Sequence, residues 1–233
     1  MRAWLIPVAA YLLGSIPFGY LLVRSKTGGD VRAQGSGNIG ATNVMRVAGM
    51  SLGLLTLLLD GAKGFAAVAL ADVLSYHSIQ QPYVFMETGT NLPSHHFGWI
   101  ALALVLVLAG HAFTPWLRFR GGKGVAAAAG AFLALSPSAL GWAVVIFLVL
   151  LAASRFVSLA SLAASLAFPF LLWHEVGSGY PPIIYVATAV AIALIFARHA
   201  GNIGRLLRGQ ERRFGQRVAL APGGSTREGG AAR

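Results

Sequence analysis

The chain has 233 residues, of which 56% are hydrophobic and 11% are charged, and its formal net charge is +11. Soluble globular domains usually carry about 25% charged residues, so this composition excludes an ordinary soluble domain and indicates a protein that uses lipid as its solvent. The chain contains no cysteine, which excludes disulfides, thiolate metal sites and cysteine nucleophiles. The basic residues punctuate apolar runs, which favours membrane anchoring and anionic ligands over nucleic acid.

Long apolar runs recur along the chain, and each is expected to be a helix because a polypeptide in a bilayer must satisfy its own backbone hydrogen bonds. The sequence lacks the period-2 alternation of an outer-membrane barrel. The first run has no clear basic start and no small-residue cleavage site, so we expect a span rather than a removed signal peptide. The runs cover residues 3–23, 51–74, 99–117, 125–135, 140–153, 156–173 and 183–197.

The placement of lysine and arginine predicts the topology, because these residues favour the cytoplasmic ends of spans. Basic residues follow the first, third, fifth and seventh runs, whereas segments 75–98 and 174–182 contain none. Seven spans, with the N-terminus outside and the C-terminus cytoplasmic, place every basic cluster inside, and six spans do not. This topology makes Ser136-Pro137-Ser138 a tight outer turn.

The run at 125–135 is short for a hydrocarbon core of about 30 Å. It must therefore tilt little, thin the bilayer locally or be shielded by protein. We predict an all-α fold, a polytopic integral membrane bundle of seven transmembrane helices in a single domain over residues 1–213. The polar tail at 214–233 is expected to be disordered and cytoplasmic.

A glycine-rich segment follows the first run, where residues 35–43 read GSGNIGATN and Arg46 comes soon after. The segment formally matches the dinucleotide fingerprint, but that site needs a preceding strand, and an expected membrane helix stands there instead. The glycines let the backbone approach a ligand and turn its N–H groups inward, so an anion site is predicted. A flexible cytoplasmic loop is the alternative.

Two ionisable residues interrupt the second run. Asp60 and Lys63 are spaced i, i+3 and can pair if helical. Ionisable groups within a span are costly and are functional by default. A purely structural ion pair is the alternative interpretation.

A second glycine-rich segment, RFRGGKG at 118–124, precedes the fourth run. A Walker A loop is excluded, because Leu117 stands where that pattern needs glycine and Val125 follows the last glycine. Glycines at a helix N-terminus expose N–H groups where the dipole favours an anion, and Lys123 adds charge. Anchoring by positive charge alone does not require three glycines. His111, before this segment, is interpreted as a packing or interfacial histidine.

The last two basic segments follow the fifth and seventh runs. Arg155 after the fifth run is either a phosphate ligand or an anchor. Residues 198–207 read RHAGNIGRLL and place His199 and Asn202 at i, i+3, on one face of a helix. His199 can act as acid, base or oxyanion donor. A basic cap on the last helix is the alternative.

Taken together, these segments resemble the bacterial acyl-phosphate:glycerol-3-phosphate acyltransferase family, PlsY, over residues 4–213. The resemblance rests on GSGNIGATN, LDGAKG, GHAFTPWLRFRGGKGVA, SRFVSLASL and RHAGNIGRLLRGQE in this order. It implies a multi-pass enzyme of the bacterial cytoplasmic (inner) membrane whose active site faces the cytoplasm. That enzyme moves a fatty acyl group from acyl-phosphate to the 1-hydroxyl of sn-glycerol 3-phosphate, giving lysophosphatidic acid and phosphate in the first step of phospholipid synthesis.

The resemblance also implies site residues and partners. The implied catalytic residues are Ser36, Lys123, His199 and Asn202. The predicted substrate and phosphate ligands are Gly35, Gly37, Asn38, Gly40, Thr42, Asn43, Arg46, Lys63, Gly121, Gly122, Gly124, Ser154, Arg155 and Arg205. The expected partners are the two substrates and the lipid bilayer, with no nucleic acid, no metal and no cofactor. Oligomeric state is left open.

The residues also bound the mechanism. No histidine is followed five residues later by aspartate, which argues against acyltransferases of the H-x4-D type. We predict no acyl-enzyme intermediate, and catalysis by positioning and oxyanion stabilisation. The proton of the hydroxyl leaves to His199 or to the donor phosphate, and the second route is favoured because His199 lies among cations.

Two other classes of function remain as alternatives. An organophosphate transporter would need polar groups near the midplane of the membrane, and only Asp60 and Lys63 interrupt a run. A scaffold that binds anionic lipid headgroups would not need the glycines.

Overall fold

The computed structural model describes residues 4–76 and 94–215, and these residues form helices and loops without a strand. The apolar runs are confirmed as helical. The α-helices are α1 Leu5–Ser15, α2 Phe18–Thr27, α3 Ala41–Ala48, α4 Met50–Tyr76, α5 Ser94–Ala112, α6 Val125–Leu135, α7 Pro137–Ser154, α8 Val157–Val176, α9 Pro182–Arg198 and α10 Ala200–Leu207. Short 3-10 helices are η1 Val31–Ala33, η2 Pro115–Leu117 and η3 Gly177–Gly179.

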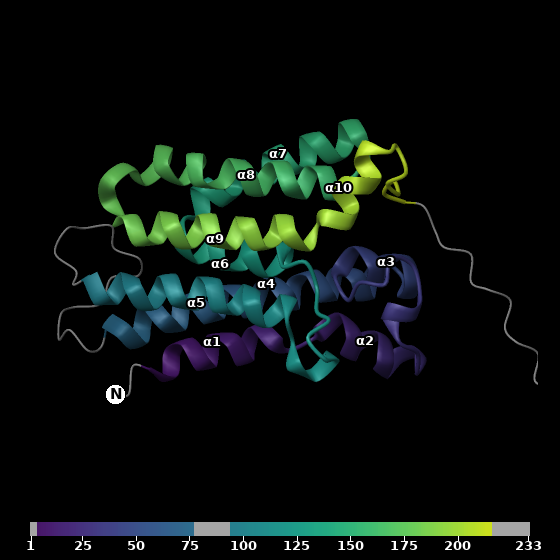
Figure 1. Ribbon diagram of the computed structural model, residues 1–233, viewed down its shortest axis with the longest axis horizontal. Coiled ribbons are helices and arrows are strands. Elements are labelled where there is room, and N and C mark those ends of the chain that lie inside the picture. The colour runs from purple at the N-terminus through teal and green to yellow at the C-terminus, as the bar shows by residue number, and fades with distance from the viewer. Residues whose placement is uncertain (1–3, 77–93, 216–233) are drawn as a thin grey trace, which may run out of the picture.

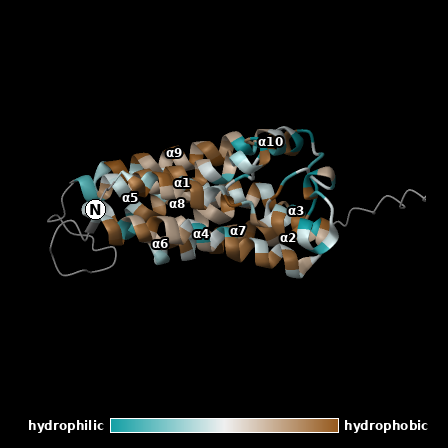
Figure 2. Ribbon diagram, turned by 90° about the horizontal axis from the view of Figure 1, so that it is seen from below, coloured by the Kyte–Doolittle hydropathy of each residue, from teal (hydrophilic) through white to brown (hydrophobic). Residues whose placement is uncertain are grey.

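The long helices lie roughly side by side along the long axis of the molecule, and α2, α3 and α10 gather at one end (Figure 1). The N-terminal end of α1 lies at the opposite end. Hydrophobic residues dominate the length of the helices, and hydrophilic residues gather around α10 and the loops near it (Figure 2). The polar segments after α2, α5, α7 and α9 therefore meet at the end that holds α2, α3 and α10, which we call the cavity end.

Span length supports a smaller count than the sequence predicts. Among the described residues, five helical stretches are long and apolar enough to cross a membrane, and α9 with α10 makes a sixth although the two are bent by 59°. Helix α6, with 11 residues, falls short of that length. The integral membrane fold thus rests on five to six apolar spans, and the seventh requires α6 to be counted.

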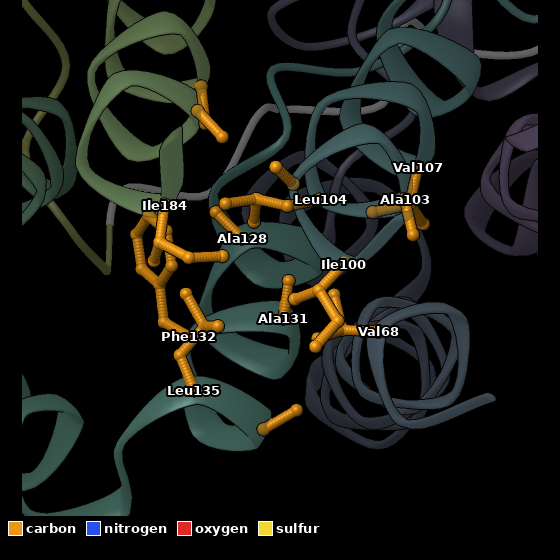
Figure 3. Close-up of a cluster of buried hydrophobic side chains, with 14 of the residues drawn as sticks. Val68, Ile100, Ala103, Leu104, Val107, Ala128, Ala131, Phe132, Leu135 and Ile184 are labelled. Carbon is orange, nitrogen blue, oxygen red and sulfur yellow. The ribbon is translucent and has the colours of Figure 1, made fainter. Parts of the chain in front are cut away.

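Helix α6 lies in the centre of the bundle. Seven of its 11 residues are buried. A Cβ atom on Gly64 of α4 would collide with the carbonyl of Ala127, and one on Gly130 with the carbonyl of Gly61, so the two helices pack backbone to backbone. Figure 3 shows Ala128 and Ala131 of α6 in the same buried cluster as residues of α4, α5 and α9. Protein rather than lipid therefore surrounds most of this short helix.

Two breaks connect the sequence to this arrangement. Ser136 alone separates α6 from α7, and its hydroxyl accepts the N–H of Ala139 at 3.2 Å, which confirms the predicted tight turn. The first run is two helices rather than one, because Pro17 lacks an N–H group and the chain is extended at Ile16. The freed carbonyl of Ile16 accepts a hydrogen bond from Lys63 Nζ at 2.7 Å.

Candidate active site

A cavity of about 340 Å³ lies at the cavity end of the bundle. Four helices begin at its wall, namely α3 at Ala41, α6 at Val125, α8 at Val157 and α10 just before Asn202. The N-terminus of a helix carries roughly half a positive charge and presents free N–H groups. The converging helix starts therefore make the cavity a site for an anion.

Four cationic side chains line the cavity, and three of them, Arg46, Lys123 and Arg205, come from different glycine-rich segments, while the fourth is Arg212. The pKa of Lys123 is lowered to about 8, mainly by burial, with Glu211 opposing the shift and the nearby arginines adding to it. A phosphate group bound here would favour the charged form of the lysine. The cavity therefore combines fixed positive charge with a lysine whose charge responds to pH near neutrality.

The buried imidazole of His199 has a defined tautomer. Its Nδ1 lies 2.8 Å from the carbonyl oxygen of Ile195, and a carbonyl can only accept, so Nδ1 carries the proton. In the neutral ring Nε2 is then a hydrogen-bond acceptor. His199 lines the cavity, which makes it suited to hold or receive the proton of a hydroxyl.

Glu211 is a member of the site that sequence reasoning missed. Its Oε1 accepts hydrogen bonds from Asn202 Nδ2 at 2.7 Å and Ser158 Oγ at 3.1 Å, and its Oε2 accepts one from Arg205 Nε at 2.8 Å. Burial raises the pKa of Glu211, but these hydrogen bonds outweigh burial and the net shift is downward. The carboxylate thus ties the start of α8 to α10. The sequence feature that could have indicated Glu211 is its position as a single acidic residue in an arginine-rich segment.

The first glycine-rich loop is organised by Asn43, whose side chain is buried. Its Nδ2 donates to the carbonyls of Val31, Gln34 and Asn38 at 2.8–3.2 Å, and its Oδ1 accepts the N–H of Ser36 at 2.7 Å. The predicted anion nest is therefore partly used by the loop itself. Asn43 shapes the loop instead of reaching out from it.

The second glycine-rich loop corrects a prediction. The N–H groups of Gly121 and Gly122 donate to the carbonyls of Ala112 and His111 at 3.1 and 3.0 Å, so they are not free for an anion. Their carbonyls accept hydrogen bonds from Arg198 at 3.0 and 3.1 Å. A Cβ on either glycine would collide with His111. Close packing explains these glycines, and the result is a rigid loop that carries Lys123.

Several predicted ligands do not line the cavity, namely Gly37, Lys63, Gly121, Gly122, Ser154 and Arg155. Lys63 Nζ lies 2.8 Å from Asp60 Oδ1 and binds Ile16. Ser154 Oγ donates to the carbonyl of Leu150 at 2.6 Å, and Arg155 Nη2 donates to the carbonyl of Phe214 at 3.2 Å. These side chains are used by the protein itself. Ser158 and Ser161, in the first two turns of α8, line the cavity in their place.

The other predicted residues come together at the cavity wall. They are Gly35, Ser36, Asn38, Gly40, Thr42, Asn43, Arg46, Lys123, Gly124, His199, Asn202 and Arg205. Residues outside the predicted set that also line the wall are Leu57, Asp60, His111, Phe147, Val157, Ser158, Ser161, Glu211 and Arg212, among others. His111 therefore belongs to the site, although the sequence indicated a packing role. No group of three metal-ligating side chains occurs within the described ranges.

Comparison with known proteins gives a consistent result. A family model described as glycerol-3-phosphate acyltransferase matches residues 4–209. A glycerol-3-phosphate acyltransferase of Pseudomonas syringae pv. syringae is 43% identical, over 91% of this chain and 97% of the relative. One of Thermosynechococcus vestitus is 42% identical, over 91% of this chain and 94% of the relative.

Solved structures are similar as well. The crystal structure of PlsY (YgiH), an integral membrane glycerol 3-phosphate acyltransferase, in its glycerol 3-phosphate form has a TM-score of 0.78 and 36% identity, covering 92% of this chain and 96% of that chain. The lysophosphatidic acid form of the same protein has a TM-score of 0.76 and 35% identity, with the same coverage.

Proposed function

This chain belongs to the glycerol-3-phosphate acyltransferase family of membrane proteins, and from that premise we propose that its acyl donor is an acyl-phosphate. The reaction moves the fatty acyl group to the 1-hydroxyl of sn-glycerol 3-phosphate and gives lysophosphatidic acid and phosphate. Phospholipid synthesis is the context that the family gives. The related crystal structures hold glycerol 3-phosphate and lysophosphatidic acid, which supports the same acceptor and product here.

One observation carries the proposal. Arg46, Lys123 and Arg205 are far apart in the chain and line one cavity with four helix starts. The same cavity has apolar walls at Leu57 and Phe147. Two phosphate groups and one acyl chain require this combination of cationic and apolar surface.

The chemistry follows from the donor. An acyl-phosphate is a mixed anhydride with a good leaving group, so the enzyme needs mainly to position the hydroxyl and to stabilise the tetrahedral oxyanion. The oxygen of the 1-hydroxyl forms the new ester bond as the carbonyl–phosphate bond breaks. The proton leaves to the released phosphate, and Nε2 of His199 is the alternative acceptor.

We propose no acyl-enzyme intermediate. The chain has no cysteine. Within the described part of the chain, the serine that is hydrogen-bonded to a histidine is Ser75, which bonds His96 at the end of the bundle opposite the cavity. A nucleophilic serine needs an adjacent base. Among the described residues no cavity serine is hydrogen-bonded to a histidine, and the carboxylate beside Ser158, Glu211, already accepts hydrogen bonds from Asn202 and Arg205.

The proposed topology has seven spans in a bacterial inner membrane, with α6 counted as the fourth, and a single domain over residues 1–213. The N-terminus is outside and the cavity faces the cytoplasm, because the basic segments lie at the cavity end. The tail predicted at 214–233 falls almost wholly outside the described residues, as does most of segment 75–98.

A donor assay tests the reaction. Purified protein in detergent, given palmitoyl-phosphate and glycerol 3-phosphate, should release phosphate and form lysophosphatidic acid, and palmitoyl-CoA should not replace the donor. Equal rates with palmitoyl-CoA would contradict the proposed donor. Mass spectrometry of protein incubated with palmitoyl-phosphate alone should show no acylated enzyme, and stoichiometric acylation would contradict direct transfer.

The absence of cysteine allows a clean test of topology. Ser178→Cys, in η3, should react with a membrane-impermeant thiol reagent in intact cells. Lys26→Cys, at the cavity end of α2, should react only after lysis. The reverse pattern would contradict the proposed orientation while leaving the donor assay unaffected.

A further inference from the structure

Asp60 and His111 are buried groups at the cavity wall that the mechanism above does not use. Asp60 is 2% exposed and His111 is 4% exposed, and both line the cavity. Buried polar groups are normally hydrogen-bonded, and an exception in a native fold calls for an explanation. His111 supplies such an exception through its Nδ1 atom.

The two side chains face each other. His111 Nδ1 lies 3.6 Å from Asp60 Oδ1, and this nitrogen makes no hydrogen bond to a described residue. Asp60 Oδ1 is fixed from the other side by Lys63 Nζ at 2.8 Å. The ion pair holds a carboxylate oxygen opposite one specific nitrogen of the imidazole.

The other imidazole nitrogen points to the loop that carries Lys123. A Cβ atom on Gly122 would collide with His111 Nε2. The backbone carbonyl of His111 also accepts the N–H of Gly122 at 3.0 Å. The ring is therefore held with Nδ1 toward a carboxylate and Nε2 beside the residue that precedes Lys123.

A carboxylate facing Nδ1 favours the tautomer in which Nδ1 carries the proton and Nε2 is an acceptor, as in other carboxylate–histidine pairs. An acceptor at the cavity wall suits a hydroxyl group. The phosphate of an acceptor molecule with both groups is drawn to Arg46, Lys123 and Arg205, which leaves its hydroxyl to His111.

We propose that His111, in the tautomer set by Asp60, accepts a hydrogen bond at Nε2 from a hydroxyl of the acyl acceptor, and that this contact selects an alcohol that carries a phosphate over a phosphate monoester without hydroxyls. The inference rests on the proposed function for the identity of the acceptor. His111 contacts the substrate, and Asp60 is a positioning residue.

Two substitutions of His111 separate the roles of its nitrogens, because the amide of glutamine lies near the position of Nε2 and that of asparagine near Nδ1. His111→Gln should keep kcat/KM for glycerol 3-phosphate within about 10-fold of the wild type, and His111→Asn should lose about 100-fold, mainly in KM. His174→Gln, an exposed histidine in α8, is the matched control and should be unchanged. Asparagine performing as well as glutamine would overturn the proposal.

A ligand comparison tests the same contact without the reaction. Glycerol 3-phosphate and ethyl phosphate share a phosphate monoester, but ethyl phosphate has no hydroxyl. The wild type should bind glycerol 3-phosphate more tightly by thermal-shift titration, and Asp60→Asn should reduce that preference about 10-fold. An unchanged preference in Asp60→Asn, or an equal weakening of binding for both ligands, would overturn the proposal. This test remains decisive if His111→Asn fails to fold. A wild-type protein that binds glycerol 3-phosphate more tightly than ethyl phosphate but transfers no acyl group would contradict the proposed function and leave this inference standing.

Discussion

Helices α4 and α5 carry two buried carboxylate–histidine pairs, one at each end of the bundle, and the pairs differ in how completely they are bonded. Opposite the cavity, His96 Nε2 lies 3.1 Å from Asp72 Oδ1, and His96 Nδ1 lies 2.8 Å from Ser75 Oγ. At the cavity end, His111 Nδ1 lies 3.6 Å from Asp60 and forms no such bond. The same residue types are thus bonded differently. The pair opposite the cavity is part of a closed network between helices, and the pair at the cavity leaves His111 Nδ1 without a hydrogen bond.

The pair opposite the cavity also shows how residue identity can mislead. Ser75, His96 and Asp72 are the side-chain types of a hydrolytic triad, although the three residues are not adjacent in the sequence. The hydroxyl of Ser75 lies 2.6 Å from the carbonyl of Ala71, to which it donates, and Ser75 is 1% exposed. Its hydrogen is engaged and no described cavity reaches it, so we assign this cluster to helix packing.

The largest effect is expected at the cavity. Lys123→Ala should lower kcat/KM for palmitoyl-phosphate and glycerol 3-phosphate about 10²–10³-fold, because it removes the buried cation beside the reacting phosphates. Phosphate release measures this. Lys26→Ala, an exposed lysine in α2, is the control and should retain the wild-type rate. A Lys123→Ala variant with more than half of the wild-type activity would show that the reaction does not take place in this cavity.

The comparison between the two pairs is sharpened by changing one carboxylate at a time. Asp72→Asn breaks a closed buried pair and should lower the free energy of unfolding by about 3 kcal/mol, with kcat/KM nearly unchanged at temperatures where the protein stays folded. Asp60→Asn should act mainly on glycerol 3-phosphate binding. Thermal unfolding in detergent and steady-state kinetics measure the two effects. The comparison would be contradicted if Asp72→Asn lowered substrate binding and Asp60→Asn lowered only stability.

A smaller effect is expected from the clamp on the second glycine-rich loop. Arg198→Gln should lower kcat/KM about 10-fold, because the fork that binds the carbonyls of Gly121 and Gly122 is lost. Arg198→Lys should not restore the rate, since a single ammonium does not reproduce the planar fork. Arg208→Gln is the matched control, because Arg208 is exposed and bonds only its neighbour Gln210 among the described residues. Full activity of Arg198→Lys would contradict this role.

The smallest effect is a pH dependence. The pKa of Lys123 is lowered to about 8, mainly by burial, so the lysine binds phosphate best below that pH and loses charge above it. KM for glycerol 3-phosphate should rise up to about 10-fold between pH 7 and pH 9. Lys123→Arg should give a flatter profile, because arginine stays charged.

Stability should follow the opposite trend over part of this range. From pH 8 to about 10.5 the unfolded chain keeps a proton on Lys123 that the folded protein has released, so the contribution of this group to stability rises with pH. Loss of activity above pH 8 is therefore not a sign of unfolding. A flat KM in the wild type would contradict a lowered pKa of Lys123 in the free protein.

Most of the helices could be predicted from the sequence, because each apolar run is long enough to require internal hydrogen bonding. The break between α1 and α2 was missed, since the carbonyl of Ile16 is satisfied by Lys63, 47 positions away. The 59° bend between α9 and α10 was missed as well. The first break is marked locally by Pro17, whereas the Lys63 that bonds the Ile16 carbonyl lies in a distant segment, which a local pattern does not contain.

The site was predictable to a similar extent. The glycine-rich segments and their cations were recognisable by residue type, and the structure brings residues of all three segments to one cavity. Local patterns could not reveal that Arg198 serves the carbonyls of a distant loop or that Arg155 bonds Phe214. They also could not separate His111 from a packing histidine, because its significance lies in the distance to Asp60.

The burial of α6 has a consequence for how the protein is made. This helix is completed before α9 is synthesised, yet Ile184 of α9 belongs to the cluster that encloses it (Figure 3). During translation α6 therefore lies beside α4 and α5 with part of its surface uncovered until α9 is inserted. Biogenesis of the bundle is then a late docking event, and a chain truncated before α9 should be recognised by membrane proteases although most of its hydrophobic segments are already present.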